Sequence, residues 1–158
     1  MRILATTVSI ALALTGCATT SGAALGGGVE SITYETGPCF GACPVYRVTV
    51  NRDGEGLFEG RRFTAVAGER RFPVTPEQFR AFAAHLAPLR PASGERRYAG
   101  EACETMATDL PSAEVIWRAA DRQSLYFYYG CDMERNRAIA ERLSAAPDLL
   151  PIAEFVGD

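Results

Sequence analysis

Alternating apolar and polar positions fill the first part of the chain beyond its N-terminal segment. Residues 31–36, 44–50 and 55–62 are rich in β-branched and aromatic side chains, and their period of two predicts three strands. Between the second and the third of them, Asp53-Gly54 is a pair typical of hairpin turns. A second hairpin is predicted to return through residues 70–74. These segments together indicate an antiparallel sheet.

The spacing of apolar residues changes from two to helical after residue 75. Thr75, Pro76 and Gln78 are the residue types of a helix N-terminus, with threonine as N-cap and proline in the first turn. The following apolar residues form one stripe at helical spacing: Phe79, Phe82, Leu86 and Leu89. A helix is therefore predicted from residue 76 to about Arg90.

The second half of the chain repeats the order of strands followed by a helix. Residues 91–110 are predicted to be a loop, and residues 114–119 and 124–129 to form a further hairpin. Asp132 is expected to cap a last helical region that continues past Pro147. The pattern as a whole predicts an α+β domain, with a mainly antiparallel sheet and two helices packed on one face.

The N-terminal segment has the pattern of an export signal. Residues 3–14 form an apolar run after one positive charge, and the run is shorter than the roughly 20 residues that a membrane-spanning helix needs. Leu14-Thr15-Gly16-Cys17 resembles the bacterial lipobox, whose cysteine is lipidated before the signal is cut off. We expect residues 1–16 to be removed and Cys17 to anchor the chain in the membrane. An ordinary secretory signal with a cysteine at the cut is the alternative.

The residues after Cys17 are expected to separate the anchor from a folded domain. Residues 17–28 are small and rich in glycine, which is typical of a flexible tether, and residues 29–158 have a length suited to one domain. Ala18 stands where an inner-membrane retention signal of the enterobacterial type carries aspartate. The expected destination is therefore the outer membrane, facing the periplasm.

Composition excludes one class of partner. All 16 basic residues are arginine, the acidic residues number 19, and the formal net charge is −3. The arginine doublets at 61–62, 70–71 and 96–97 are separated by acidic and apolar residues and form no extended basic stripe. Binding to nucleic acid is therefore not expected.

Four further cysteines are expected to form two disulfides. An even number of cysteines in an exported chain favours disulfides over free thiols. Three pairings are possible, and we prefer Cys39 with Cys43 and Cys103 with Cys131. Pro38 and Gly41 allow the tight turn that the first pair needs. Crossed pairings remain open.

The segment around the first two cysteines resembles a known family. Residues 39–46, Cys-Phe-Gly-Ala-Cys-Pro-Val-Tyr, lead into the turn at 51–54 and then into Leu-Phe-Glu-Gly at 57–60. This order is similar to the bacterial domain of unknown function 6438, whose signature is Cys-Phe-Gly-x-Cys-Pro-x-Tyr. Residues 108–111 match a later corner of that family in part. The likeness covers about residues 32–158 and implies a fold family but no activity.

Cys39 and Cys43 also have the spacing of a copper-binding Cys-x-x-x-Cys-Pro motif, in which a distant histidine completes the site. The only histidine, His85, lies at the edge of the predicted apolar stripe, which is typical of a surface residue, and the predicted order of elements lacks the βαβ unit of a thioredoxin fold. A structural disulfide is therefore preferred, with a redox-active dithiol as another alternative. The sequence has a single histidine, and it shows neither a Gly-x-Ser-x-Gly elbow nor a recognisable carboxylate pair. We therefore assign no catalytic, metal or cofactor site.

Two tyrosines are candidates for a binding surface. If Leu125 and Phe127 face the helices, alternation places Tyr126 and Tyr128 on the open face of the sheet, where they could contact a glycan or a protein. The alternative is that they simply cover the sheet, and Trp117 is expected in the core. The sequence therefore predicts a non-catalytic envelope module that contacts the cell wall or another envelope protein. A periplasmic thiol-redox or copper-handling protein is the second interpretation.

Overall fold

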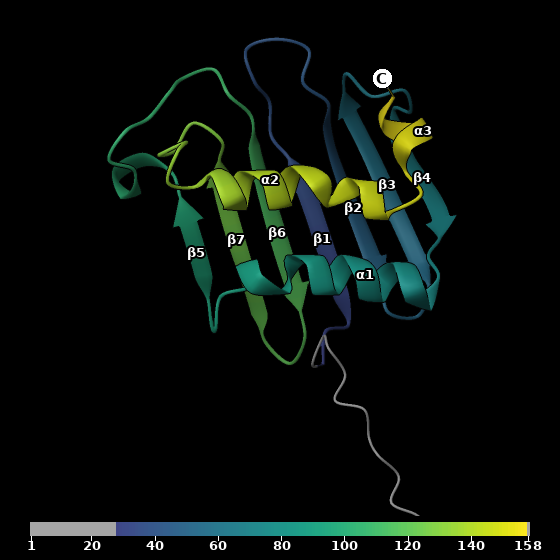
Figure 1. Cartoon of the computed structure of the whole chain (residues 1–158). Helices are drawn as coiled ribbons and strands as arrows, with labels where there is room; N and C mark the ends of the chain where they lie inside the picture. Colours follow the sequence, from purple (N-terminus) through teal and green to yellow (C-terminus); the bar gives the residue numbers. More distant parts are fainter. Residues whose placement is uncertain (1–27, 158) are drawn as a thin grey trace, which may run out of the picture.

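The structure is a computed structural model that describes residues 28–157 (Figure 1). The predicted signal peptide, the lipidation site Cys17 and the tether up to residue 27 lie outside the described residues. No helix of the described residues is both long and apolar enough to span a membrane.

A seven-stranded sheet forms the centre of the fold. Its spatial order is β4-β3-β2-β1-β6-β7-β5, so that β1 lies in the middle. Every neighbouring pair is antiparallel except β5 and β7, which are parallel. The strands are β1 (Ser31–Thr36), β2 (Val45–Asn51), β3 (Glu55–Arg62), β4 (Gly68–Pro73), β5 (Glu95–Tyr98), β6 (Ser112–Arg118) and β7 (Arg122–Tyr128). The prediction of an α+β fold with a mainly antiparallel sheet is confirmed.

Strand β5 corrects the prediction of a continuous loop between residues 91 and 110. Residues 95–98 read Glu-Arg-Arg-Tyr and lie at the edge of the sheet with mostly exposed side chains. An edge strand of this kind has no alternating apolar pattern, because neither of its faces is deeply buried. Its pairing with β7 connects segments far apart in the sequence, for which local periodicity gives no signal.

Within residues 28–157, three short α-helices complete the fold, where two were predicted. They are α1 (Pro76–Leu86), α2 (Arg137–Ala145) and α3 (Ala153–Val156), and short 3₁₀ turns occur at η1 (Ala87–Leu89), η2 (Gly100–Ala102) and η3 (Pro147–Leu149). Helix α1 begins as predicted, because Thr75 and Gln78 form a reciprocal capping box. In Figure 1, α1 and α2 both cross in front of the sheet.

The start of α2 differs from the prediction. The N-cap is Asn136 rather than Asp132, and its side chain makes no capping hydrogen bond. Asp132 instead accepts hydrogen bonds from the backbone N–H groups of Glu104 (3.1 Å) and Thr105 (2.7 Å). Its carboxylate therefore fixes a loop far away in the sequence, which a local capping rule does not detect.

The core lies on the side of the sheet toward which the buried strand side chains point. Alternate positions of β1, β2, β6 and β7 are buried, as the period of two predicted. Trp117 is 1 % exposed, which confirms its predicted core position. Two reciprocal contacts join α1 to α2: His85 Nε2 lies 2.8 Å from the Arg142 carbonyl oxygen, and Arg142 donates to the His85 carbonyl (2.9 Å).

The two ends of the sheet differ in character. We call the loops at 37–44, 63–67, 99–111 and 129–136 the distal loops, because they lie at the end of the sheet away from the start of β1 (Figure 1). Four large apolar side chains of the described residues are exposed, and all four belong to the distal loops: Phe40, Phe63, Met106 and Met133. Both disulfides are also in these loops.

Candidate functional site

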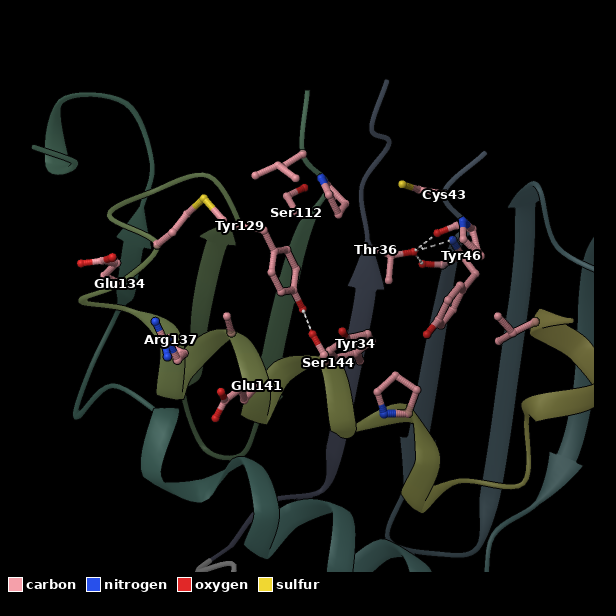
Figure 2. A pocket seen from close by; sticks show the side chains of 17 residues that line it. Tyr34, Thr36, Cys43, Tyr46, Ser112, Tyr129, Glu134, Arg137, Glu141 and Ser144 are labelled. Carbon is pink, nitrogen blue, oxygen red and sulfur yellow. Dashed lines mark hydrogen bonds between the residues drawn. The ribbon is translucent and has the colours of Figure 1, made fainter. Parts of the chain in front are cut away.

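An open groove of about 920 Å³ lies between α2 and the distal ends of the central strands (Figure 2). Its lining is mostly apolar, and three tyrosines contribute to it from three different strand segments. We call it the tyrosine groove, and define it by Tyr34, Tyr46, Tyr129, Pro44, Pro111, Pro147 and Met133. Its volume is within the range typical of small-molecule sites, which is roughly 300–1,000 Å³.

Tyr34 and Tyr46 form the floor of the groove. They occupy adjacent strands, β1 and β2, with their ring centroids 6.4 Å apart. The Tyr34 hydroxyl donates to the carbonyl of Leu143 in α2 (3.0 Å), which ties the helix to the central strand. Burial raises the pKa of both tyrosine hydroxyls, so both are neutral donors at physiological pH.

Tyr129 follows β7 and forms one side of the groove. Its hydroxyl accepts a hydrogen bond from Ser144 Oγ (3.2 Å), which Figure 2 shows as a dashed line. Its ring meets the Phe127 ring edge-on at 5.2 Å between centroids. The ring is therefore held from both ends, and the groove has a fixed wall here.

The Tyr46 hydroxyl is different from those of Tyr34 and Tyr129. The side chain is only 4 % exposed and lines the groove, yet within residues 28–157 its hydroxyl makes no hydrogen bond. Figure 2 shows this hydroxyl directed into the open space of the groove. Since the described residues include no buried side-chain polar atom without a partner, the Tyr46 hydroxyl is open to solvent and available to a ligand in the groove.

The Cys39–Cys43 disulfide forms another wall. The bond closes a five-residue ring with Cα atoms 5.8 Å apart, and Cys43 and Pro44 line the groove. Thr36 Oγ1 supports this wall, because it donates to the Pro44 carbonyl (2.8 Å) and accepts from the Tyr46 N–H (3.0 Å). The preferred pairing of these two cysteines is confirmed.

The Cys103–Cys131 disulfide holds the opposite end, with Cα atoms 5.3 Å apart. Cys131 is fully buried and pairs with Met106 in an isolated β-bridge. This pairing is also confirmed. The bond positions the loop that supplies Met133 and Glu134 to the groove.

The rim of the groove beside α2 carries charge. Glu134, Arg137 and Glu141 line this rim and are exposed, and no ion pair joins them to one another or to any other described residue. Figure 2 shows all three on the side of the groove away from Tyr46. The site thus combines an apolar interior, the Tyr46 hydroxyl as an available donor and a charged, solvated rim.

Comparison with known proteins identifies the family. Residues 30–147 match the family model described as Domain of unknown function (DUF6438). The chain belongs to the DUF6438 family. No curated protein and no solved structure matches it. The three tyrosines and both disulfides lie inside the matched region, but DUF6438 membership assigns no activity, so the site must be judged from its geometry.

The two tyrosines singled out from the sequence of this DUF6438 member do not belong to the groove. Tyr126 and Tyr128 alternate with the buried Leu125 and Phe127 and lie on the opposite face of the sheet. The Arg97 guanidinium lies over the Tyr126 ring at 4.1 Å. Both tyrosines are half-buried.

The residues considered for metal or thiol chemistry are also placed. Cys39 and Cys43 are joined in a disulfide, so neither offers a thiolate ligand. His85 is half-buried and turned toward Arg142 of α2, and it does not line the groove. Within residues 28–157 no group of three or more histidine, cysteine or carboxylate side chains could hold a metal ion.

Sequence reasoning missed the tyrosine groove. The period of two placed Tyr34 and Tyr46 in strands. It gave no sign that they line one groove together with Tyr129, which follows β7. A search for aromatic residues with a hydroxyl at buried strand positions would have found Tyr34 and Tyr46, although not the space beside them.

Proposed function

We propose that this chain is an envelope lipoprotein whose folded domain is a non-catalytic binding module, with the tyrosine groove as its binding site. The lipobox-like sequence supports the envelope location, with Cys17 as the anchor in an outer membrane and the domain facing the periplasm. In this proposal α1 and α2 pack on one face of the sheet, and α2 supplies the charged rim of the groove. The partner is the cell wall or another envelope protein.

The observation that carries the proposal is the Tyr46 hydroxyl. The Tyr46 side chain is 4 % exposed, and its hydroxyl is neutral, faces the open groove and makes no hydrogen bond with the described residues. A ligand that fits has an apolar body to lie against Tyr129 and the groove prolines, and one hydrogen-bond acceptor to meet Tyr46. Nothing in the groove resembles a nucleophile with its base, which is why binding rather than catalysis is proposed.

A neutral apolar dye tests the groove as a binding site. We use the mature chain from residue 17, with Cys17→Ser to prevent lipidation, and titrate it with N-phenyl-1-naphthylamine, whose fluorescence rises in apolar sites. Saturable binding is expected. Ser144→Trp fills the groove from an exposed position of α2 and should weaken binding at least tenfold.

Ala145→Trp is the matched control, because Ala145 is the exposed neighbour of Ser144 but does not line the groove. Its binding should equal that of the parent chain. Equal binding by all three chains would contradict the proposal, since the dye would then be held elsewhere.

The anchor needs a separate test. A Cys17→Ala chain expressed with its own signal should move from the membrane pellet to the soluble periplasmic fraction and should lose labelling by radioactive palmitate. A variant that remains in the pellet would contradict lipid anchoring without affecting the groove assay.

A further inference from the structure

Phe40 is the most exposed large apolar side chain of the described residues, at 88 %. It occupies the tip of the five-residue ring closed by Cys39 and Cys43, and its N–H donates to the Asp109 carbonyl (3.1 Å). The ring and this hydrogen bond restrict the loop on two sides. A large exposed aromatic side chain on a fixed loop is typical of an interface anchor.

We propose that Phe40 of one copy docks into the tyrosine groove of a second copy, which gives a two-fold symmetric dimer. The inference rests on the proposed function in one respect, because both take the groove as a binding site. It adds an interaction surface, loop 37–44, and names its partner as another copy of the same chain.

The position of loop 37–44 favours a symmetric dimer. Cys43 and Pro44, at one end of this loop, are themselves part of the groove lining. The loop that carries Phe40 and the tyrosine groove therefore lie side by side on one surface of the molecule. A two-fold axis pairs a surface with itself, so each copy can place its Phe40 side chain in the groove of the other.

The chemistry of the loop complements that of the groove. Residues 37–44 include no charged side chain, so the loop can approach Glu134 and Glu141 of the partner's rim without like-charge repulsion. Within residues 28–157 no N–H or hydroxyl donates to the carbonyls of residues 39–42. These carbonyls can accept a hydrogen bond from a partner, and the Tyr46 hydroxyl, which faces the groove, can donate one.

The disulfide reduces the entropic cost of docking. A flexible loop loses conformational entropy when it becomes ordered on binding, and this loss costs free energy. A loop closed by a disulfide has already lost much of that entropy in the free protein, so its docking costs less. Met133, an exposed side chain that lines the groove, adds apolar area beside the incoming ring. The contact area remains small compared with that of an obligate dimer, so we expect reversible association in the micromolar range.

Sedimentation equilibrium of the mature Cys17→Ser chain, from about 2 to 200 μM, tests the dimer in solution. The parent chain should show a monomer–dimer equilibrium, and Phe40→Ser should raise the dissociation constant at least tenfold. Phe63→Ser is the matched control, because Phe63 is also an exposed phenylalanine of the distal loops, at 52 %, but does not line the groove. It should leave the equilibrium unchanged.

Two outcomes would overturn the inference. The first is a parent chain that stays monomeric over the whole concentration range. The second is an equal effect of Phe40→Ser and Phe63→Ser, which would indicate unspecific apolar association. The dye assay on the Phe40→Ser chain separates the two proposals. Saturable dye binding by a chain that never dimerises keeps the groove as a binding site and removes only the second copy as its occupant.

The lipidated protein in its own membrane provides a second measurement. With p-benzoylphenylalanine in place of Phe40, ultraviolet light should produce a crosslinked dimer whose second attachment lies in the groove, identified by mass spectrometry. Crosslinks to other proteins alone would overturn the inference. The same photoreactive residue in place of Phe63 should give no dimer.

Discussion

The two faces of the sheet both carry tyrosines, but only those on the helix side line the tyrosine groove. On the open face, Arg97 covers the Tyr126 ring, and the Tyr128 hydroxyl accepts a hydrogen bond from the Leu110 N–H (3.3 Å). On the helix side, the Tyr46 side chain is 4 % exposed, and its hydroxyl faces the open groove and makes no hydrogen bond within residues 28–157.

The charged groups of the open face extend the contrast. Glu35 in the central strand accepts hydrogen bonds from Arg47 and Arg61, and Glu114 lies near Arg122. A ligand on this face would have to replace interactions that already exist, which lowers the net gain of each new contact. The comparison teaches that exposure of tyrosines on a sheet face is a weaker sign of a binding site than a tyrosine hydroxyl that faces an apolar groove.

The largest expected difference between the two faces is in stability. Phe127→Ala removes a ring that is 1 % exposed on the helix side of β7, and should lower the free energy of unfolding by about 3–5 kcal/mol. Tyr126→Ala, the adjacent residue on the open face, should lower it by at most about 1 kcal/mol. Urea denaturation of the oxidised proteins measures both. Equal losses would mean that the open face is covered by a contact absent from this structure.

The two groove tyrosines should differ from each other by a smaller amount. Tyr34→Phe removes the hydrogen bond to the Leu143 carbonyl and should cost about 1–2 kcal/mol of unfolding free energy. Tyr46→Phe removes a hydroxyl without a partner and should change stability by no more than about 0.5 kcal/mol. Thermal or urea unfolding checks the pair. A Tyr46→Phe chain as unstable as Tyr34→Phe would show that the Tyr46 hydroxyl is satisfied.

Acid should loosen the loop at residues 104–105 that Asp132 holds. The backbone N–H groups of Thr105 and Glu104 hold the pKa of the Asp132 carboxyl below its usual range. A lowered pKa in the folded state stabilises the fold above the unfolded value of about 4, and this contribution is lost as the pH falls through the lower folded value. In NMR spectra, the amide signal of Thr105 should titrate with a midpoint below about 4. Asp132→Asn should abolish this titration.

The smallest effect is expected on the open face itself. Arg97→Ala removes the cation above the Tyr126 ring and should lower the free energy of unfolding by about 0.5 kcal/mol, because such contacts are weak at exposed sites. It should also increase the rate at which tetranitromethane nitrates Tyr126. An unchanged rate would show that Arg97 does not cover the ring in solution.

The sequence predicted the elements whose signals are local. The period of two identified β1, β2, β3, β6 and β7, and Thr75 with Gln78 identified the start of α1 because capping involves residues three positions apart. Both disulfide pairings were the preferred ones of three that the sequence left open, and the structure confirms them. Export, lipidation and the tether remain predictions, since they fall on residues outside the described part of the chain.

The features that the sequence did not reveal depend on contacts between distant segments. Strand β5 is stabilised by β7, and Asp132 is fixed by two amides almost thirty residues away. The groove is a space between elements, and its key residue, Tyr46, looks in the sequence like any other buried strand position. Only three-dimensional packing shows that its hydroxyl has no partner.

The central place of β1 has a mechanical consequence. The chain enters the sheet through β1, which is hydrogen-bonded on both sides, to β2 and to β6. If residue 17 is fixed to a membrane while a partner holds the distal loops, tension acts along β1 and loads both ladders in shear. Hydrogen bonds sheared together share the force, whereas an edge strand peeled sideways breaks them one at a time. If both attachments exist, the position of β1 lets the domain carry load between them.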